Sequence, residues 1–451
     1  MTMTAAALLS SCGLYKSYER PADIQMDNLY RSENVQGGDS LGMASLGWQE
    51  VFTDPKLQVL IEKGLSQNTN MLSAQLQIEQ AEATLKAAKW AYIPSLALAP
   101  QGTLAGVDWG KATQTYTIPA TASWQLDLFG SLHNAKKRAK AQLANSEAFR
   151  QAVQSQLIAA IANYYYSLAM LGDQLAISME TEKLWKENVK TTRALMEAGQ
   201  SNMAAVSQTE ANYYSICTQI TDLKQQISDL ENEFCALLGD APQKYDIGTM
   251  DGWTVPSNLS AGVPAAALAN RPDVKQAETQ LAAAYYATNE SRAAFYPGIN
   301  LSGTIGWTND LGTVVNPGKW IWSAIGSLTQ PLFQNGKLRA QYKISKAQQE
   351  QAKLTFQQTL LDAGTEVNAA LTKIQASDEK GGLYDKQVAA LELAVKSTQA
   401  LMMNSSTNYL QVLTAQQTLL TAQMSQISNR FDQIQAVIEL YQALGGGYTT
   451  E

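Results

Sequence analysis

The chemically reactive side chains of this chain are few, and they form no known catalytic pattern. His133 is the single histidine, and the three cysteines, Cys12, Cys217 and Cys235, lie far apart in the sequence. A histidine-based metal site, a histidine-dependent triad and a disulfide framework are therefore all disfavoured. The sequence also lacks a phosphate-binding loop, a nucleophile elbow, a zinc-protease motif and a Cys-x-x-Cys pair. We expect no enzyme, no cofactor and no resident metal ion.

Cys12 is the one cysteine in a setting that indicates chemistry. Residues 1–11 are small and apolar, and the sequence Leu-Ser-Ser-Cys-Gly around Cys12 resembles a bacterial lipoprotein box. The start is atypical, because the first basic residue is Lys16 and signal peptides normally open with positive charge. We expect a signal peptide over 1–11, acylation of Cys12 (as by palmitate) and an extended segment over 12–56. One acyl chain gives only marginal membrane affinity, so further membrane contacts are expected.

The composition disfavours two other classes of protein. Only 16% of the 451 residues are charged, the net charge is −7, and acids and bases are mixed along most of the chain. No basic face therefore indicates nucleic acid as a partner. No run approaches the roughly 18 apolar residues of a membrane-spanning helix.

Proline placement predicts very long helices. No proline occurs over 120–241 or from residue 332 to the end, and an interior proline costs a helix about 3 kcal/mol. Within these stretches apolar residues recur in steps of three and four, as in coiled-coil seams. The predicted helices cover about 131–197, 201–238, 336–402 and 407–444.

The chain contains an internal duplication. Ala91-Tyr92-Ile93-Pro94 matches Ala294-Phe295-Tyr296-Pro297 at an offset of 203, and later landmarks match at 206. These later pairs are Gly130 with Gly336, Val206 with Val412, and Gly239 with Gly445. The sequence thus predicts a first repeat over 57–242, a linker over 243–267 and a second repeat over 268–447.

Four segments alternate apolar and polar residues and are expected to be strands. They cover about 95–107, 114–128, 298–308 and 319–333. At roughly 10 residues or more each, they are long enough to cross a membrane as barrel strands. Five tryptophans in or beside them are candidates for an interfacial aromatic girdle: Trp109, Trp124, Trp307, Trp320 and Trp322. Four strands cannot close a barrel in lipid, whereas three chains would supply twelve.

Several motifs, in order over about 400 residues, resemble the TolC-like outer-membrane efflux family, in its lipoprotein branch serving resistance-nodulation-division pumps. They are Trp124–Gly130, Asn270–Val274, Ser291–Pro297, Thr329–Phe333, Tyr409–Gln416 and Ala443–Tyr448.

The resemblance implies an α+β membrane protein with a duplicated strand-helix repeat. As a homotrimer it would form a 12-stranded β-barrel continued by a long α-helical coiled-coil tunnel. It also implies an outer-membrane channel of a tripartite efflux pump, a passive exit duct for drugs or other small molecules. The expected partners are further copies of the chain, a periplasmic adaptor, an inner-membrane pump of the resistance-nodulation-division type and outer-membrane lipid.

Two alternatives remain open from the sequence. The same channel could serve type I protein secretion, or the heptads could belong to a structural coiled-coil lipoprotein without a pore. The tryptophan-flanked strands in both repeats argue against the second alternative. The transported substrate is not encoded in any motif of the sequence.

The expected periplasmic gate departs from the family pattern. Family members often carry a Leu-x-x-x-Asp spacing at this turn, where this chain has Leu410 and Thr414, and no charged residue occurs over 397–429. The candidate gate residues in the second repeat are Met402, Met403, Leu410 and Thr414, which offer apolar contacts and a hydroxyl. Charged candidates come only from the first repeat, namely Arg193 and Glu197. Alternatively, the uncharged stretch is an adaptor-facing surface.

Overall fold

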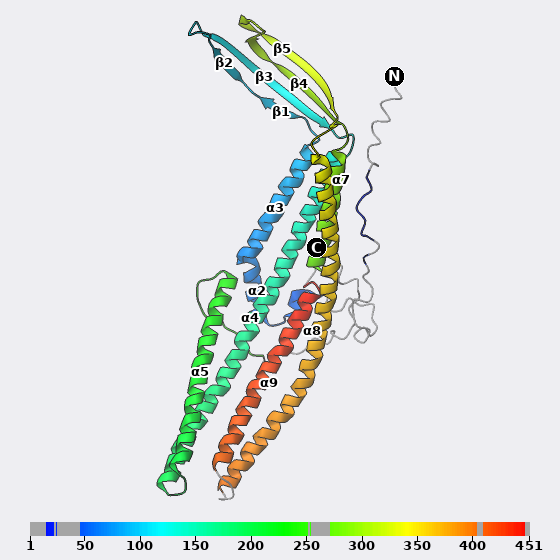
Figure 1. Ribbon diagram of the computed structural model, residues 1–451. Helices are drawn as coiled ribbons and strands as arrows, with labels where there is room; N and C mark the ends of the chain where they lie inside the picture. Colours follow the sequence, from blue (N-terminus) through cyan, green and yellow to red (C-terminus); the bar gives the residue numbers. More distant parts are fainter. Residues whose placement is uncertain are drawn as a thin grey trace. The chain divides into compact units, whose positions relative to one another are not determined.

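A computed structural model describes residues 15–21, 24, 46–250, 253, 271–403 and 409–446 (Figure 1). The chain divides into two compact units. The first holds residues 1–25, 76–148 and 275–359, which include the whole sheet; the second holds residues 26–75, 149–274 and 360–451. Cys12 and its lipoprotein box lie outside the described residues.

The sheet of the first unit is antiparallel and combines strands from both repeats. Its order is β1-β3-β4-β5, with β2 also paired to β3. The strands are β1 (Ser95–Leu98), β2 (Gln101–Ala105), β3 (Thr113–Leu126), β4 (Gly298–Asp310) and β5 (Val314–Thr329). The long β3–β4 ladder, from Thr117↔Thr308 to Leu126↔Ile299, joins the two repeats.

The first predicted strand, 95–107, is wrong as a continuous strand, because the structure divides it into β1 and β2. The register against β3 is the same on both sides of the break, from Leu98↔Ala120 to Gln101↔Thr117. Pro100 lies in the gap and Pro119 lies opposite it. Two prolines remove two ladder donors at one place, and a single bond from the Ala99 amide to the Pro119 carbonyl (3.1 Å) bridges the gap.

Six longer helices repeat in pairs. They are α3 (Thr69–Trp90) and α7 (Pro272–Ala293), α4 (Ser131–Glu197) and α8 (Lys337–Met403), and α5 (Met203–Leu238) and α9 (Tyr409–Ala443). Helix α5 begins two residues later than predicted because the side chain of Asn202 accepts from the Ala205 amide and caps it. Among the described residues, none of the helices is both long and apolar enough to cross a membrane.

Helices α4 and α8 show the duplication most directly. Each has 67 residues, and both their ends differ by 206 in number. Each starts after a glycine with positive φ, Gly130 (72°) and Gly336 (77°). The later glycines Gly239 (77°) and Gly445 (98°) follow α5 and α9 in the same conformation. A left-handed backbone suits glycine, so these matched landmarks have a conformational reason.

The extended segment expected over 12–56 is partly helical. A short helix, α1 (Trp48–Val51), buries Trp48 and Val51, and α2 (Pro55–Gln67) begins inside the predicted segment. Asp54 caps α2 by accepting from the Lys56 amide (2.9 Å). A capping Asp followed by proline is a strong helix start, and the buried residues Leu57, Leu60, Ile61 and Gly64 follow helical spacing along α2.

Candidate functional site

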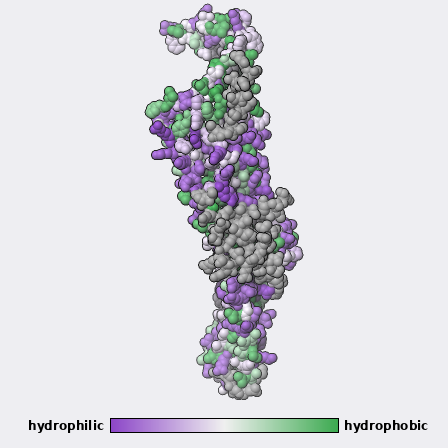
Figure 2. Space-filling view, turned by 90° about the vertical axis from the view of Figure 1, so that its right-hand side faces the viewer, coloured by the Kyte–Doolittle hydropathy of each residue, from purple (hydrophilic) through white to green (hydrophobic). Residues whose placement is uncertain are grey.

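One face of the sheet is apolar and open in the single chain. The register places alternate residues of each strand on this face, namely the even-numbered residues of β1, β2, β3 and β5 and the odd-numbered residues of β4. Its large side chains are Leu96, Leu98, Leu104, Tyr116, Ile118, Trp124, Leu126, Ile299, Leu301, Ile305, Trp307, Trp320, Trp322 and Leu328. Leu96 is 83% exposed and Trp322 is 80% exposed. Figure 2 shows green, hydrophobic residues on the surface of the sheet at the top of the view.

The opposite face of the sheet carries mainly hydroxyl groups. Thr117 pairs across the strands with Thr308, and their hydroxyl oxygens are 2.8 Å apart. The row Thr121, Thr304 and Ser323 continues the same chemistry. No helix of the described residues covers either face, whereas a soluble antiparallel sheet commonly packs one face on a core.

The five candidate girdle tryptophans lie towards two ends of the sheet. Trp124 is near the helical end, where its indole N–H donates to the Tyr92 carbonyl (2.9 Å). The other four lie nearer the hairpin ends, and the rings of Trp307 and Trp320 meet edge to face at 5.6 Å. Trp124 pairs with Leu301, six residues before Trp307 along β4. At about 3.4 Å per residue the two levels are about 20 Å apart along the strand.

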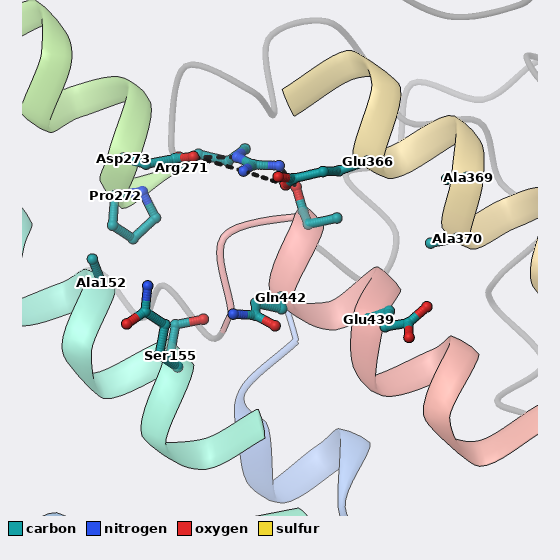
Figure 3. A pocket seen from close by; sticks show the side chains of 12 residues that line it. Ala152, Ser155, Arg271, Pro272, Asp273, Glu366, Ala369, Ala370, Glu439 and Gln442 are labelled. Atoms are coloured by element: carbon teal, nitrogen blue, oxygen red, sulfur yellow. Dashed lines mark hydrogen bonds and ion pairs between the residues drawn. The ribbon is translucent and has the colours of Figure 1, made fainter. Parts of the chain in front are cut away.

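In the second unit, the Arg-Pro-Asp motif that opens the second repeat holds three helices together (Figure 3). Arg271 is 5% exposed. Its guanidinium donates twice to Asp273 (3.0 and 2.7 Å), once to Glu366 on α8 (2.7 Å) and once to the Ala443 carbonyl at the end of α9 (2.8 Å). Burial alone lowers the pKa of Arg271, but the bonds to Asp273 and Glu366 outweigh it and raise this pKa. The charge is therefore permanent, and it borders a cavity of about 370 Å³.

The first repeat makes the same contact with a neutral residue. Asn68 precedes α3 as Arg271 precedes α7, and it is also 5% exposed. Its amide donates to the Leu237 carbonyl (2.9 Å), and Leu237 lies 206 residues before Ala443. Both junctions thus use a buried donor to bind the carbonyl near the end of the last helix of the repeat, which satisfies a group that helix termini leave unpaired.

The helical tip brings only some of the candidate gate residues together. Arg193 forms an ion pair with Glu210 on α5, and Glu197 is the exposed last residue of α4. Leu410 is 54% exposed, and the Thr414 hydroxyl donates to its carbonyl (2.9 Å) within α9.

Met402 instead packs against a buried cluster formed by Trp185, Ile216, Ile220, Leu413 and Leu420. Its side chain therefore belongs in part to the core of the second unit. Met403 ends α8, and its side chain is not among those described.

A buried polar layer between α8 and α9 was missed by the sequence reasoning. The side-chain amides of Asn429 and Gln433 both donate to the Ser377 carbonyl (3.0 and 3.1 Å). Gly381 makes room for them, since a Cβ there would lie 2.9 Å from the Gln433 nitrogen. Ser377 is 4% exposed and Asn429 is 5% exposed.

The corresponding layer between α4 and α5 is apolar. Subtracting 206 from the four positions gives Leu171, Leu175, Leu223 and Ile227. Leu171 and Leu223 are buried. The two repeats thus share one backbone plan but differ in this layer, and the pair Gly381-Gly382 inside a predicted helix was the available signal.

The described residues contain no cluster of three or more histidine, cysteine or acidic side chains that could hold a metal ion.

The model of one protein family, described as outer membrane efflux protein, matches residues 60–240 and 263–446. The chain is 26% identical to the cation efflux system protein CusC of Escherichia coli K12, covering 98% of each chain. It is 25% identical to the probable outer membrane lipoprotein SilC of Salmonella typhimurium (99% of this chain, 98% of SilC). It is 27% identical to the solvent efflux pump outer membrane protein SrpC of Pseudomonas putida (100% and 98%).

Solved structures show the same fold. The open state of the MtrE outer membrane channel of Neisseria gonorrhoeae superposes with a TM-score of 0.86 at 25% identity, covering 96% of this chain and 98% of MtrE. A structure of CusC gives a TM-score of 0.83 at 26% identity, with 96% and 99% covered.

Replacing Arg271 by Met should lower the free energy of unfolding by about 1–3 kcal/mol, because charged hydrogen bonds are lost and the Ala443 carbonyl loses its donor. Asp273 and Glu366 remain partly exposed, which keeps the cost from being larger. Tryptophan fluorescence during denaturation of the purified protein measures this. Lys244→Met, which removes an exposed cation, is the control. Equal stability of the two variants would contradict the anchoring role.

Amide hydrogen exchange should be faster over 377–382 in α8 than over 171–176 in α4. Helical glycine costs about 1 kcal/mol relative to alanine, and α8 has two glycines here where α4 has only Gly172. We expect about fivefold faster exchange. Mass spectrometry of matching peptides from one sample makes α4 the internal control. Equal or slower exchange in α8 would show that the polar layer does not weaken this helix.

Proposed function

Because the chain belongs to the outer membrane efflux protein family, we propose that it forms the passive exit duct of a tripartite pump. Its role as an outer-membrane efflux channel follows from the family match over both repeats and from relatives that are efflux-system outer membrane proteins. The observation that carries the finer proposal is the sheet, whose apolar face is open in one chain while its other face is lined by hydroxyl groups.

Three copies close one barrel in this proposal. Among the described strands, β5 at one side and β1 with β2 at the other pair on one side only. Unpaired backbone groups at such edges cost several kcal/mol each in lipid. Three copies give an even, closed barrel with the apolar face outward and the hydroxyl face towards the pore. The pore is then continued by the helices.

The partners follow from the same assignment. We infer a periplasmic adaptor that contacts the helical tip and an inner-membrane pump that supplies the driving force. Relatives named for cation and for solvent efflux match at 26% and 27% identity. Overall similarity therefore does not separate these kinds of cargo, and the substrate is set elsewhere in the pump.

A new lysine should impair assembly when it is placed on the apolar face of the sheet and should be tolerated on the polar face. Ile305→Lys should cost about 2–4 kcal/mol of membrane stability if Ile305 faces lipid, whereas Thr304→Lys on the neighbouring pore-facing position should assemble normally. The mass of the detergent-purified complex, expected to be that of a trimer, and its yield from outer membranes measure this. Equal yields, or a monomer that still conducts ions, would contradict the barrel.

Leu410→Ser should raise the basal current of the reconstituted channel if exposed apolar contacts close the tip. Leu410 is a cleaner test than Met402, which also packs in the core. Single-channel recording in planar bilayers measures this, with Leu393→Ser as a control on an exposed leucine of α8 (65% exposed). If Arg193→Gln opens the pore and Leu410→Ser does not, the gate depends on the first-repeat charges.

Cys12 should carry the lipid anchor of the mature protein. Labelling with palmitate should mark the wild type and not Cys12→Ser, because a lipoprotein box attaches its lipid through the cysteine. The barrel assembles in both proteins under this proposal, so the two share one complex mass in detergent. An unlabelled wild type would remove the anchor from the proposal.

A further inference from the structure

The first ten residues of α4 and of α8 concentrate positive charge. Residues 131–140 and 337–346 contain no carboxylate, although the whole chain has 40 acidic and 33 basic residues. We refer to their cations as the basic belt, which consists of Lys136, Lys137, Arg138, Lys140, Lys337, Arg339, Lys343 and Lys346. Both segments belong to the unit that holds the sheet.

Most of the basic belt is exposed to solvent. All four cations of α8 are exposed, as are Lys136 and Lys140 of α4. The nearby acidic groups are few: Glu290 pairs with Arg138 (3.0 Å), and Asp127 accepts from the His133 amide (2.7 Å). Glu278 lines one pocket with Lys137 and Lys140, and it forms an ion pair with Arg20 (2.5 Å). The ion pair of Glu290 leaves most of the belt's positive charge unneutralised.

Helix stability does not account for these cations. The start of a helix favours negative charge within its first turn, so Lys337 and Arg339 are unfavourable there by about 0.3–1 kcal/mol each at low salt, and the cations of the later turns gain nothing from the helix dipole. Neither α4 nor α8 has an acidic residue in its first turn. Both repeats nevertheless place lysine at matched positions, Lys137 with Lys343 and Lys140 with Lys346. An external negative group is the physical explanation for this placement.

The basic belt lies directly beyond the apolar face of the sheet. Helix α4 begins five residues after β3 ends. Between them, the ring of Phe129 stacks on that of Tyr296 at 5.0 Å, and the ammonium of Lys136 lies 5.8 Å from the Tyr92 ring centre. Ten helical residues extend about 15 Å. The chain thus passes from apolar strands to aromatic rings and then to cations. In a membrane these three match the acyl chains, the interface and the headgroups, in that order.

We propose that the basic belt binds the phosphate groups of anionic phospholipids in the periplasmic leaflet of the outer membrane. This rests on the proposed function, which places the apolar face in that membrane. A lipid can cover both surfaces at once, since its acyl chains meet the sheet and its phosphate meets the lysines. Arg339, Lys343 and Lys346 follow steps of four and three and so form one stripe along α8, which lets one leaflet contact all three.

The test compares lipids retained by the purified full-length channel. The wild type and a belt variant, Lys337→Gln with Arg339→Gln, Lys343→Gln and Lys346→Gln, are placed in nanodiscs of equal phosphatidylglycerol and phosphatidylethanolamine. Native mass spectrometry of the released complexes then counts bound lipids. A control variant removes four exposed cations farther from the sheet, Lys183→Gln with Lys380→Gln, Lys386→Gln and Lys396→Gln.

We expect the wild type and the control variant to retain more phosphatidylglycerol than phosphatidylethanolamine. The belt variant should lose this preference by about fivefold or more, since a cation near anionic lipid contributes about 1 kcal/mol. An equal loss in the control variant, or an unchanged ratio in the belt variant, overturns the proposal. If the belt variant does not assemble, the lipids retained by the wild type decide the test. A wild type that shows no enrichment of phosphatidylglycerol over phosphatidylethanolamine also overturns the proposal.

Conductance recorded from the same nanodisc samples separates this proposal from the proposed function. A conducting channel without lipid preference removes only the lipid contact. A complex that prefers the anionic lipid but never conducts supports the basic belt and contradicts the exit duct.

Discussion

The requirement that every backbone N–H and C=O be paired in a membrane is the constraint on which the rest of the structure depends. The sheet has its apolar face open and two edges paired on one side only. Such a sheet is stable in lipid only when its edges are closed. The proposed association of three copies is a consequence of that requirement.

Duplication supplies the scaffold, and substitution at matched positions supplies the differences in function. The first repeat uses neutral Asn68 where the second uses buried, charged Arg271, and both bind the carbonyl near the end of the last helix. The first repeat packs its long helices through leucines where the second uses a serine carbonyl, a glycine and two amides. The backbone plan tolerates both solutions because the matched glycines and helix lengths are unchanged.

Sequence patterns were sufficient for the features that depend on period and on backbone conformation. The proline-free stretches, the heptads and the matched glycines anticipated the helix pairs, because helices and left-handed turns depend on local residues. The strand break at Pro100 was missed because it depends on Pro119, a residue on another strand. The role of Arg271 was missed because its partners lie 95 and 172 residues away, and the packing of Met402 depends on Trp185 on a different helix.

The distribution of charge within the second repeat explains where its conformational equilibrium is set. The stretch 397–429 has no charged residue, so contacts at the tip are weak, short-ranged and little affected by salt. Arg271, with its permanent charge, joins the end of α9 at the Ala443 carbonyl to Glu366 near the middle of α8. Between these two regions, the polar layer at Ser377 and Gly381 is held by two amide bonds rather than by leucines. The helix pair is therefore anchored at Arg271, has no charged residue over 397–429, and is joined between them by amide hydrogen bonds where α4 and α5 have leucines and an isoleucine.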